Sequence, residues 1–137
     1  MRLRANQALA EVRHPAVRER AISQLMAQKW CQCEVLPLKS NLMRDDCILF
    51  ERHLRVSSNN FEHHRLIGDL VHILQANPWP ELLKVMLFVY ETSPCTNCRH
   101  EVYQLMNNQG IAPEWVTREW PHDANQQWET PIESNSF

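Results

Sequence analysis

Glycine is scarce in this sequence. The 137-residue chain has only Gly68 and Gly110. Sheet-rich domains use glycine in tight turns and bulges, so this scarcity favours helices joined by short connections. Nucleotide-binding loops need several closely spaced glycines, which excludes such a loop in any standard form. The sequence also lacks a Ser/His/Asp motif and a His-Glu-x-x-His motif. We therefore expect no catalytic activity.

Long apolar runs are absent as well. No segment approaches the ~20 apolar residues that cross a bilayer, and residues 1–7 carry positive charge without the apolar block of an export signal. The cysteines number five, which is odd. An odd count without an export signal favours a reducing compartment over a disulfide framework. These features predict a cytoplasmic protein with no membrane partner.

An excess of positive charge is also missing. The net charge is −2, which excludes a strongly basic domain that neutralises phosphates along its whole surface. The charge is uneven, however. Residues 1–60 hold 10 Lys/Arg and 6 Asp/Glu, whereas residues 61–137 hold 4 and 10. A local basic surface near the start of the chain is therefore expected.

Apolar residues recur at helical spacing along most of the chain. We expect a helix over 3–12 and another that begins at His14-Pro15. The run 82–90 is almost entirely apolar, and we assign it to a helix because no alternating strand could pair with it. Further helical segments are expected over 35–43, after Asp45-Asp46, over 61–77, from Ser93-Pro94 to Gly110, and from Pro113 towards Pro121. Residues 1–122 would form one helical domain, and 123–137 a polar tail with a possible last turn at 125–129.

Short connections force successive helices to pack as antiparallel hairpins. Two architectures satisfy this condition: a closed bundle and a stacked solenoid. The starts at His14-Pro15 and Ser93-Pro94 are loosely alike, because each is followed by an arginine and then by Leu-Met. This internal repetition favours the stack.

Two segments carry a family resemblance. The first, His14-Pro15-Ala16-Val17-Arg18, followed by Ala21 and Leu25, resembles the first helix of a HEAT repeat. The second is similar to the closing repeat of some bacterial HEAT-like proteins; it comprises Phe88–Glu91, Ser93-Pro94-Cys95-Thr96-Asn97-Cys98-Arg99, Gly110, Pro113-Glu114-Trp115 and Asp123-Ala124-Asn125. The resemblance implies an α-solenoid that binds another protein, and a chain that is the end piece of a longer array.

Four cysteines form two close pairs. Cys31 and Cys33 could join Cys95 and Cys98 as four thiolate ligands of Zn²⁺. A Cys-x-x-Cys pair at a helix start could also have lowered thiol pKa values and redox activity. Alternatively, Cys95 and Cys98 lie on an apolar face and pack as small hydrophobic residues, as Cys47 is expected to do. His64 and His72 are two helical turns, ~12 Å, apart and cannot share one ion.

The preferred prediction is a non-catalytic helical repeat domain that binds another protein and needs no cofactor. Its candidate contact residues are basic side chains near the start of the chain and tryptophans near connections: Arg2, Arg4, Arg13, Arg18, Arg20, Trp79, Trp115 and Trp120. One alternative is a zinc-binding or thiol-redox domain that uses the two cysteine pairs. Another is a nucleic-acid-binding module that uses the same arginines.

Overall fold

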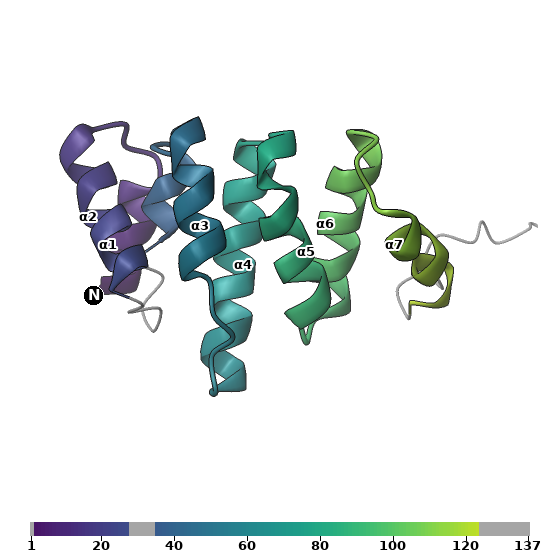
Figure 1. Cartoon of the computed structure of the whole chain (residues 1–137). Coiled ribbons are helices and arrows are strands. Elements are labelled where there is room, and N and C mark those ends of the chain that lie inside the picture. Colours follow the sequence, from purple (N-terminus) through teal and green to yellow (C-terminus); the bar gives the residue numbers. More distant parts are fainter. Residues whose placement is uncertain (1, 28–34, 124–137) are drawn as a thin grey trace, which may run out of the picture.

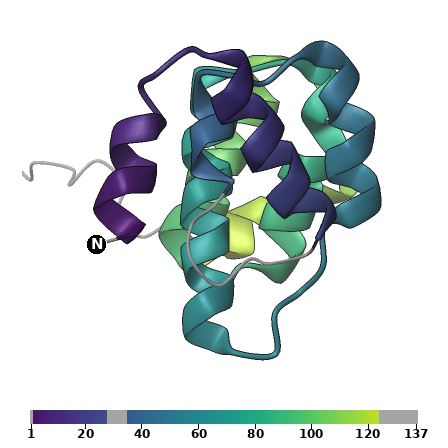
Figure 2. The ribbon, with the colours of Figure 1, turned by 90° about the vertical axis from the view of Figure 1, so that its left-hand side faces the viewer.

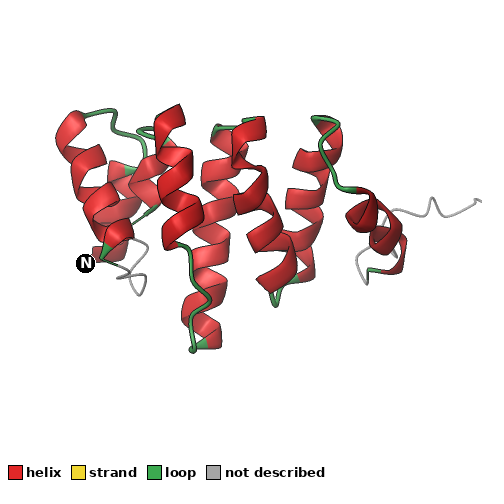
Figure 3. Cartoon of the chain, viewed as in Figure 1, coloured by secondary structure: helices red, strands yellow, loops and turns green. Residues whose placement is uncertain are grey.

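The computed structural model describes residues 2–27 and 35–123. Every regular element in these residues is helical, and they contain no strand (Figure 3). The α-helices are α1 (Arg2–Leu9), α2 (Pro15–Met26), α3 (Cys47–His53), α4 (Asn60–Ala76), α5 (Leu83–Thr92), α6 (Thr96–Asn108) and α7 (Glu114–Glu119). Four 3₁₀ turns accompany them: η1 (Leu36–Lys39), η2 (Arg44–Asp46), η3 (Pro80–Leu82) and η4 (Trp120–His122). The all-α class is confirmed.

Local sequence signals set several helix ends. Pro15 is the first residue of α2, and the Nδ1 atom of His14 accepts a hydrogen bond from the Ala16 N–H at 3.1 Å. Asn59 caps α4, because its side-chain oxygen accepts from two backbone N–H groups of the first turn. Gly110 follows α6 with φ at 68°, a left-handed conformation that glycine adopts without steric cost.

Three expected boundaries are corrected. The first helix ends at Leu9. The segment 35–43 forms only the short turn η1. The Pro37 carbonyl accepts a hydrogen bond from the Asn41 side-chain amide at 2.8 Å, in place of a backbone N–H that would continue a helix. The helix expected from Ser93-Pro94 begins at Thr96, because the Ser93 hydroxyl holds the Cys95 backbone in a turn. The possible last turn at 125–129 lies outside the described residues.

The helices follow one another across the molecule in chain order (Figure 1). On one side of this row, η1 contacts both α1 and α4, and α4 contacts α6. On the other side, α2 contacts α3, and α3 contacts α5. Figure 2 views the row from its N-terminal end. Two pairs of helices that are two apart in the chain, α3 with α5 and α4 with α6, therefore lie side by side.

Helix α4 is central to the core. Its apolar side chains Ile67, Leu70 and Leu74 are fully buried against those of neighbouring helices. One continuous core extends from Ala21 in α2 to Trp120 in η4. None of the helices in residues 2–27 and 35–123 combines the length and hydrophobicity that crossing a bilayer requires.

Candidate functional site: a basic groove and a thiol–imidazole cluster

A groove of about 670 Å³ lies where α2 begins and α4 ends. Figure 1 shows these two helix ends at the same edge of the row. The groove brings together three of the predicted contact residues: Arg13, Arg18 and Trp79. Its other lining residues are His14, Pro15, Glu19, Lys39, Ser40, Asn41, Leu42, Met43, Ala76 and Asn77.

The basic side chains of the groove differ in their pairing. Arg18 forms an ion pair with Asp46, whose side chain is only 2% exposed and also accepts from the Met43 N–H. Lys39 pairs with Glu11 at 2.5 Å, a contact open to water. Arg13 is exposed and forms no ion pair with the described residues, so its charge is available to a ligand.

An apolar surface accompanies these charges. Met43 is 53% exposed, and Trp79 is partly exposed where the chain enters η3. The Arg44 guanidinium lies 4.8 Å from the centre of the Trp79 ring and bonds to Glu81 at 2.7 Å. This cation–π contact and ion pair hold the indole in place at the groove wall.

Two buried asparagines fix the shape of the groove. The Asn41 side chain accepts from the His14 N–H at 2.9 Å and donates to the Val12 carbonyl at 2.7 Å. The Asn77 amide, at the end of α4, donates to the Lys39 carbonyl at 2.9 Å. These bonds join segments 27 to 38 residues apart in the chain, so the groove walls are held by polar contacts as well as by packing.

The other predicted basic residues lie away from this groove. Arg4 is exposed on α1, and Arg20 lines a smaller hollow between α1 and α2. The side chain of Arg2 lies outside the described residues.

The remaining two tryptophans differ from each other. Trp115 is 40% exposed and lines a separate hollow of about 510 Å³, where it meets Tyr90 edge-on at 5.9 Å. Trp120 is only 4% exposed, because its indole stacks on Tyr103 of α6 at 4.3 Å. Trp120 is therefore a core residue, and its indole offers no contact surface to a partner.

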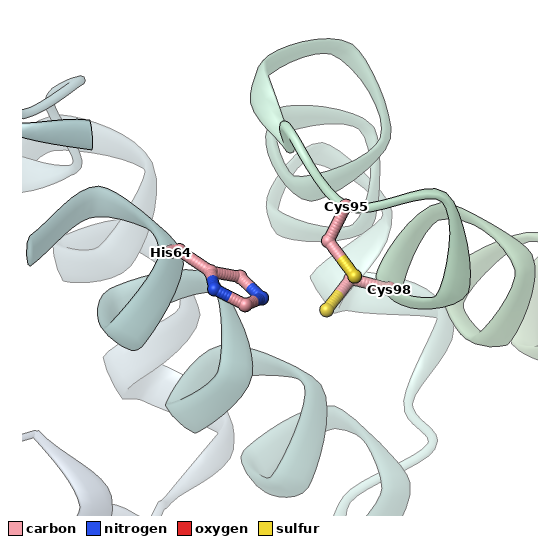
Figure 4. Close-up of side chains that lie close together, drawn as sticks. All are labelled: His64, Cys95 and Cys98. Atoms are coloured by element: carbon pink, nitrogen blue, oxygen red, sulfur yellow. The ribbon is translucent and has the colours of Figure 1, made fainter. Parts of the chain in front are cut away.

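The second Cys pair lies beside a histidine from another helix. Figure 4 shows His64 of α4 facing Cys95 and Cys98 at the start of α6. One ring nitrogen and the two sulfurs all lie within 4.8 Å of one another. Both cysteines are partly buried, and His64 is exposed. Cys31 and Cys33, the other pair of the predicted zinc site, lie outside the described residues.

The Cys98 thiol is not activated by its position near a helix start. The pKa of the Cys98 thiol is raised to about 12, mainly by burial. A hydrogen bond with Cys95 and the charge of Cys95 also raise this pKa, whereas a hydrogen bond with Ser93 lowers it by less. This direction is opposite to the lowered pKa expected of a redox-active pair. Cys47 is buried, as expected, and burial also raises its pKa.

His63 fixes the position of the helix start that carries His64. Its ring is buried, with Nε2 at 3.1 Å from the Thr92 carbonyl and 3.0 Å from the Thr92 hydroxyl. Its Nδ1 accepts from the Ser57 N–H at 3.3 Å. Burial lowers the pKa of His63, which favours the neutral ring in these contacts. The start of α4 is thereby tied to the end of α5, three residues before Cys95.

Sequence reasoning missed the pairing of His64 with these cysteines, although a signal was present. In successive antiparallel hairpins, alternate helices run parallel, so the starts of α4 and α6 lie at the same edge.

No known protein family matches the chain, and neither curated proteins nor solved structures show significant similarity to it. The class that can be stated from the fold is an all-α helical protein.

Proposed function

We propose that this protein is a non-catalytic, HEAT-like helical domain of the cytoplasm that recognises a segment of another protein in the basic groove. The observation that carries this proposal is the convergence of Arg13, Arg18 and Trp79 on one preformed surface. Arginine and tryptophan are the residues most enriched among those that dominate binding energy at interfaces.

The order of the helices supports the stacked arrangement over a closed bundle. The contacts define two rows of elements. One row comprises α1, η1, α4 and α6, and the other comprises α2, α3 and α5. In a stack each unit contacts only its neighbours, and the edges of the row remain open for binding. The groove occupies such an edge.

The chemistry of the groove defines the kind of segment that fits. Arg13 offers a positive charge that forms no ion pair within residues 2–27 and 35–123, while Met43 and Trp79 offer exposed apolar surface beside it. A segment with an apolar anchor side chain flanked by Asp or Glu satisfies both features. The hydrogen bonds of Asn41 and Asn77 hold the groove walls in place before binding, which lowers the entropic cost of association.

Selection of random peptides displayed on phage, with the full chain as bait, tests this proposal. We expect enrichment of acidic peptides with an aromatic or aliphatic centre. In titrations of a selected synthetic peptide, Arg13→Glu and Trp79→Ala should each weaken binding at least about tenfold, because hot-spot side chains contribute more than ~1.4 kcal/mol. Arg118→Glu makes the same charge change at an exposed side chain of α7 and should leave the affinity unchanged.

Two results would refute the proposal. One is a selection that yields no acidic peptide. The other is a selected peptide that binds wild type, Arg13→Glu and Trp79→Ala equally. Tight, strongly salt-dependent binding of a random single-stranded RNA probe that is lost in Arg13→Glu would instead favour the nucleic-acid alternative. The paired states of Arg18 and Lys39 argue against that alternative.

A further inference from the structure

A metal site can be built from side chains that the basic groove does not use. His64, Cys95 and Cys98 come from two helices and converge at the edge of the row where α4 and α6 begin (Figure 4). They are the only group of three or more potential ligands within such distances in residues 2–27 and 35–123. Two sulfurs and one imidazole nitrogen form a soft donor set, which Zn²⁺ prefers to the harder ions Mg²⁺ and Ca²⁺.

The spacing of the three donor atoms is close to that of a zinc site. With Zn–S near 2.3 Å and Zn–N near 2.0 Å, tetrahedral ligand atoms lie about 3.5–3.8 Å apart. The three atoms already lie within 4.8 Å of one another. Contraction by about 1 Å needs only small side-chain rotations, since His64 is exposed and both thiols are partly exposed. An ion can reach the site directly from water.

The backbone around the cluster is held in place by contacts outside the ligands. The Ser93 hydroxyl accepts from the Cys95 N–H and donates to the Cys95 carbonyl, each at 3.1 Å. The Arg99 guanidinium donates to the Ser93 carbonyl at 2.9 Å and to Asp123 at 2.8 Å. On the other helix, buried His63 bonds to Thr92. Metal sites depend on such supporting contacts for the orientation of their ligands.

We propose that His64, Cys95 and Cys98 bind one Zn²⁺ ion and leave its fourth coordination position open to water. Both cysteines bind as thiolates, and their protons pass to the solvent. The bound ion joins the starts of α4 and α6 across the end of α5. This site uses one of the two pairs in the four-cysteine arrangement considered from the sequence, with an imidazole in place of the second pair.

Metal binding to the purified full chain under reducing conditions tests this site. We expect one zinc per chain by elemental analysis after dialysis. With Co²⁺ as a spectroscopic probe, the protein should show the intense visible bands of tetrahedral cobalt and a near-ultraviolet thiolate charge-transfer band. Cys95→Ser and Cys98→Ser should each abolish that spectrum.

His64→Ala is the sharpest variant, because its side chain is exposed and its removal leaves the core intact. It should weaken zinc binding by at least about 10–100-fold, the range that follows the loss of even an outer-shell partner. The matched control is His72→Ala, an exposed histidine on the same helix, which should bind zinc as wild type does. Circular dichroism of each variant should match that of wild type in the absence of metal.

Three results would overturn the site. The first is the absence of stoichiometric zinc in the reduced, folded protein. The second is zinc binding that His64→Ala leaves unchanged while the double variant Cys31→Ser/Cys33→Ser abolishes it, which would assign the ion to the other cysteines. The third is a Cys95–Cys98 disulfide, found by mass spectrometry, in protein kept under reducing conditions. Peptide binding in the groove is a separate measurement, so either proposal can fail alone.

Discussion

The two ends of α4 carry different chemistry. At the C-terminal end of α4, Asn77 lines a groove that contains arginines and apolar surface. Hydrogen bonds from side-chain amides fix the walls of this groove. At the start of α4, His64 faces two thiols and suits a small soft ion. His64 and Asn77 lie 13 residues apart along the helix axis, about 20 Å, which separates the two surfaces. The comparison teaches that one central helix can position two independent sites, each assembled with a different neighbour.

The largest effect should come from breaking the groove end alone. Asn41→Ala removes three hydrogen bonds and leaves the carbonyls of Val12 and Pro37 without the amide donor. We expect a loss of about 2 kcal/mol in the free energy of unfolding, measured by urea denaturation. Affinity for a groove-binding peptide should fall as well, whereas zinc binding should not change.

The control for Asn41→Ala is Asn108→Ala, an exposed asparagine at the last position of α6. It should change the stability by less than about 0.5 kcal/mol. Equal effects of the two substitutions would show that the Asn41 bonds contribute nothing specific to the groove end.

The smaller effects concern the two glycines and should have opposite signs. Gly68 lies within α4, and a Cβ added there meets no atom within 4 Å. Gly68→Ala should therefore stabilise the protein by about 1 kcal/mol, because alanine favours the helix. Gly110 has φ at +68°, so Gly110→Ala should destabilise it by about 1 kcal/mol through backbone strain.

Thermal unfolding of the two glycine variants beside wild type provides the measurement. The melting temperature should rise for Gly68→Ala and fall for Gly110→Ala. A fall for both variants would mean that α4 tolerates no added methyl group and that its packing is tighter than the structure indicates.

Features set by neighbouring residues were predictable from the sequence. Proline fixes its own φ and suits the first turn, so Pro15 marked the start of α2. Glycine alone adopts positive φ without cost, so Gly110 marked the end of α6. The apolar run 82–90 was correctly assigned to a helix, because no partner strand existed.

Features set by distant residues were not predictable in the same way. The Asn77 amide bonds to the carbonyl of Lys39, 38 residues earlier, and no local pattern encodes that contact. The approach of His64 to Cys95 depends on α4 packing beside α6. Trp120 was a candidate contact residue because it lies near a connection, and its stacking partner Tyr103 is 17 residues away along the chain. Such contacts follow from the packing of helices rather than from their individual sequences.

The most direct test of the central claim is a map of where a bound peptide lies. Backbone amide chemical shifts of the ¹⁵N-labelled protein would be followed by NMR as a selected acidic peptide is added. The account predicts that the shifted amides cluster at residues 13–19, 39–43 and 76–79, with those around His64 and Cys98 unmoved. Shifts confined instead to the hollow around Tyr90 and Trp115 would contradict it.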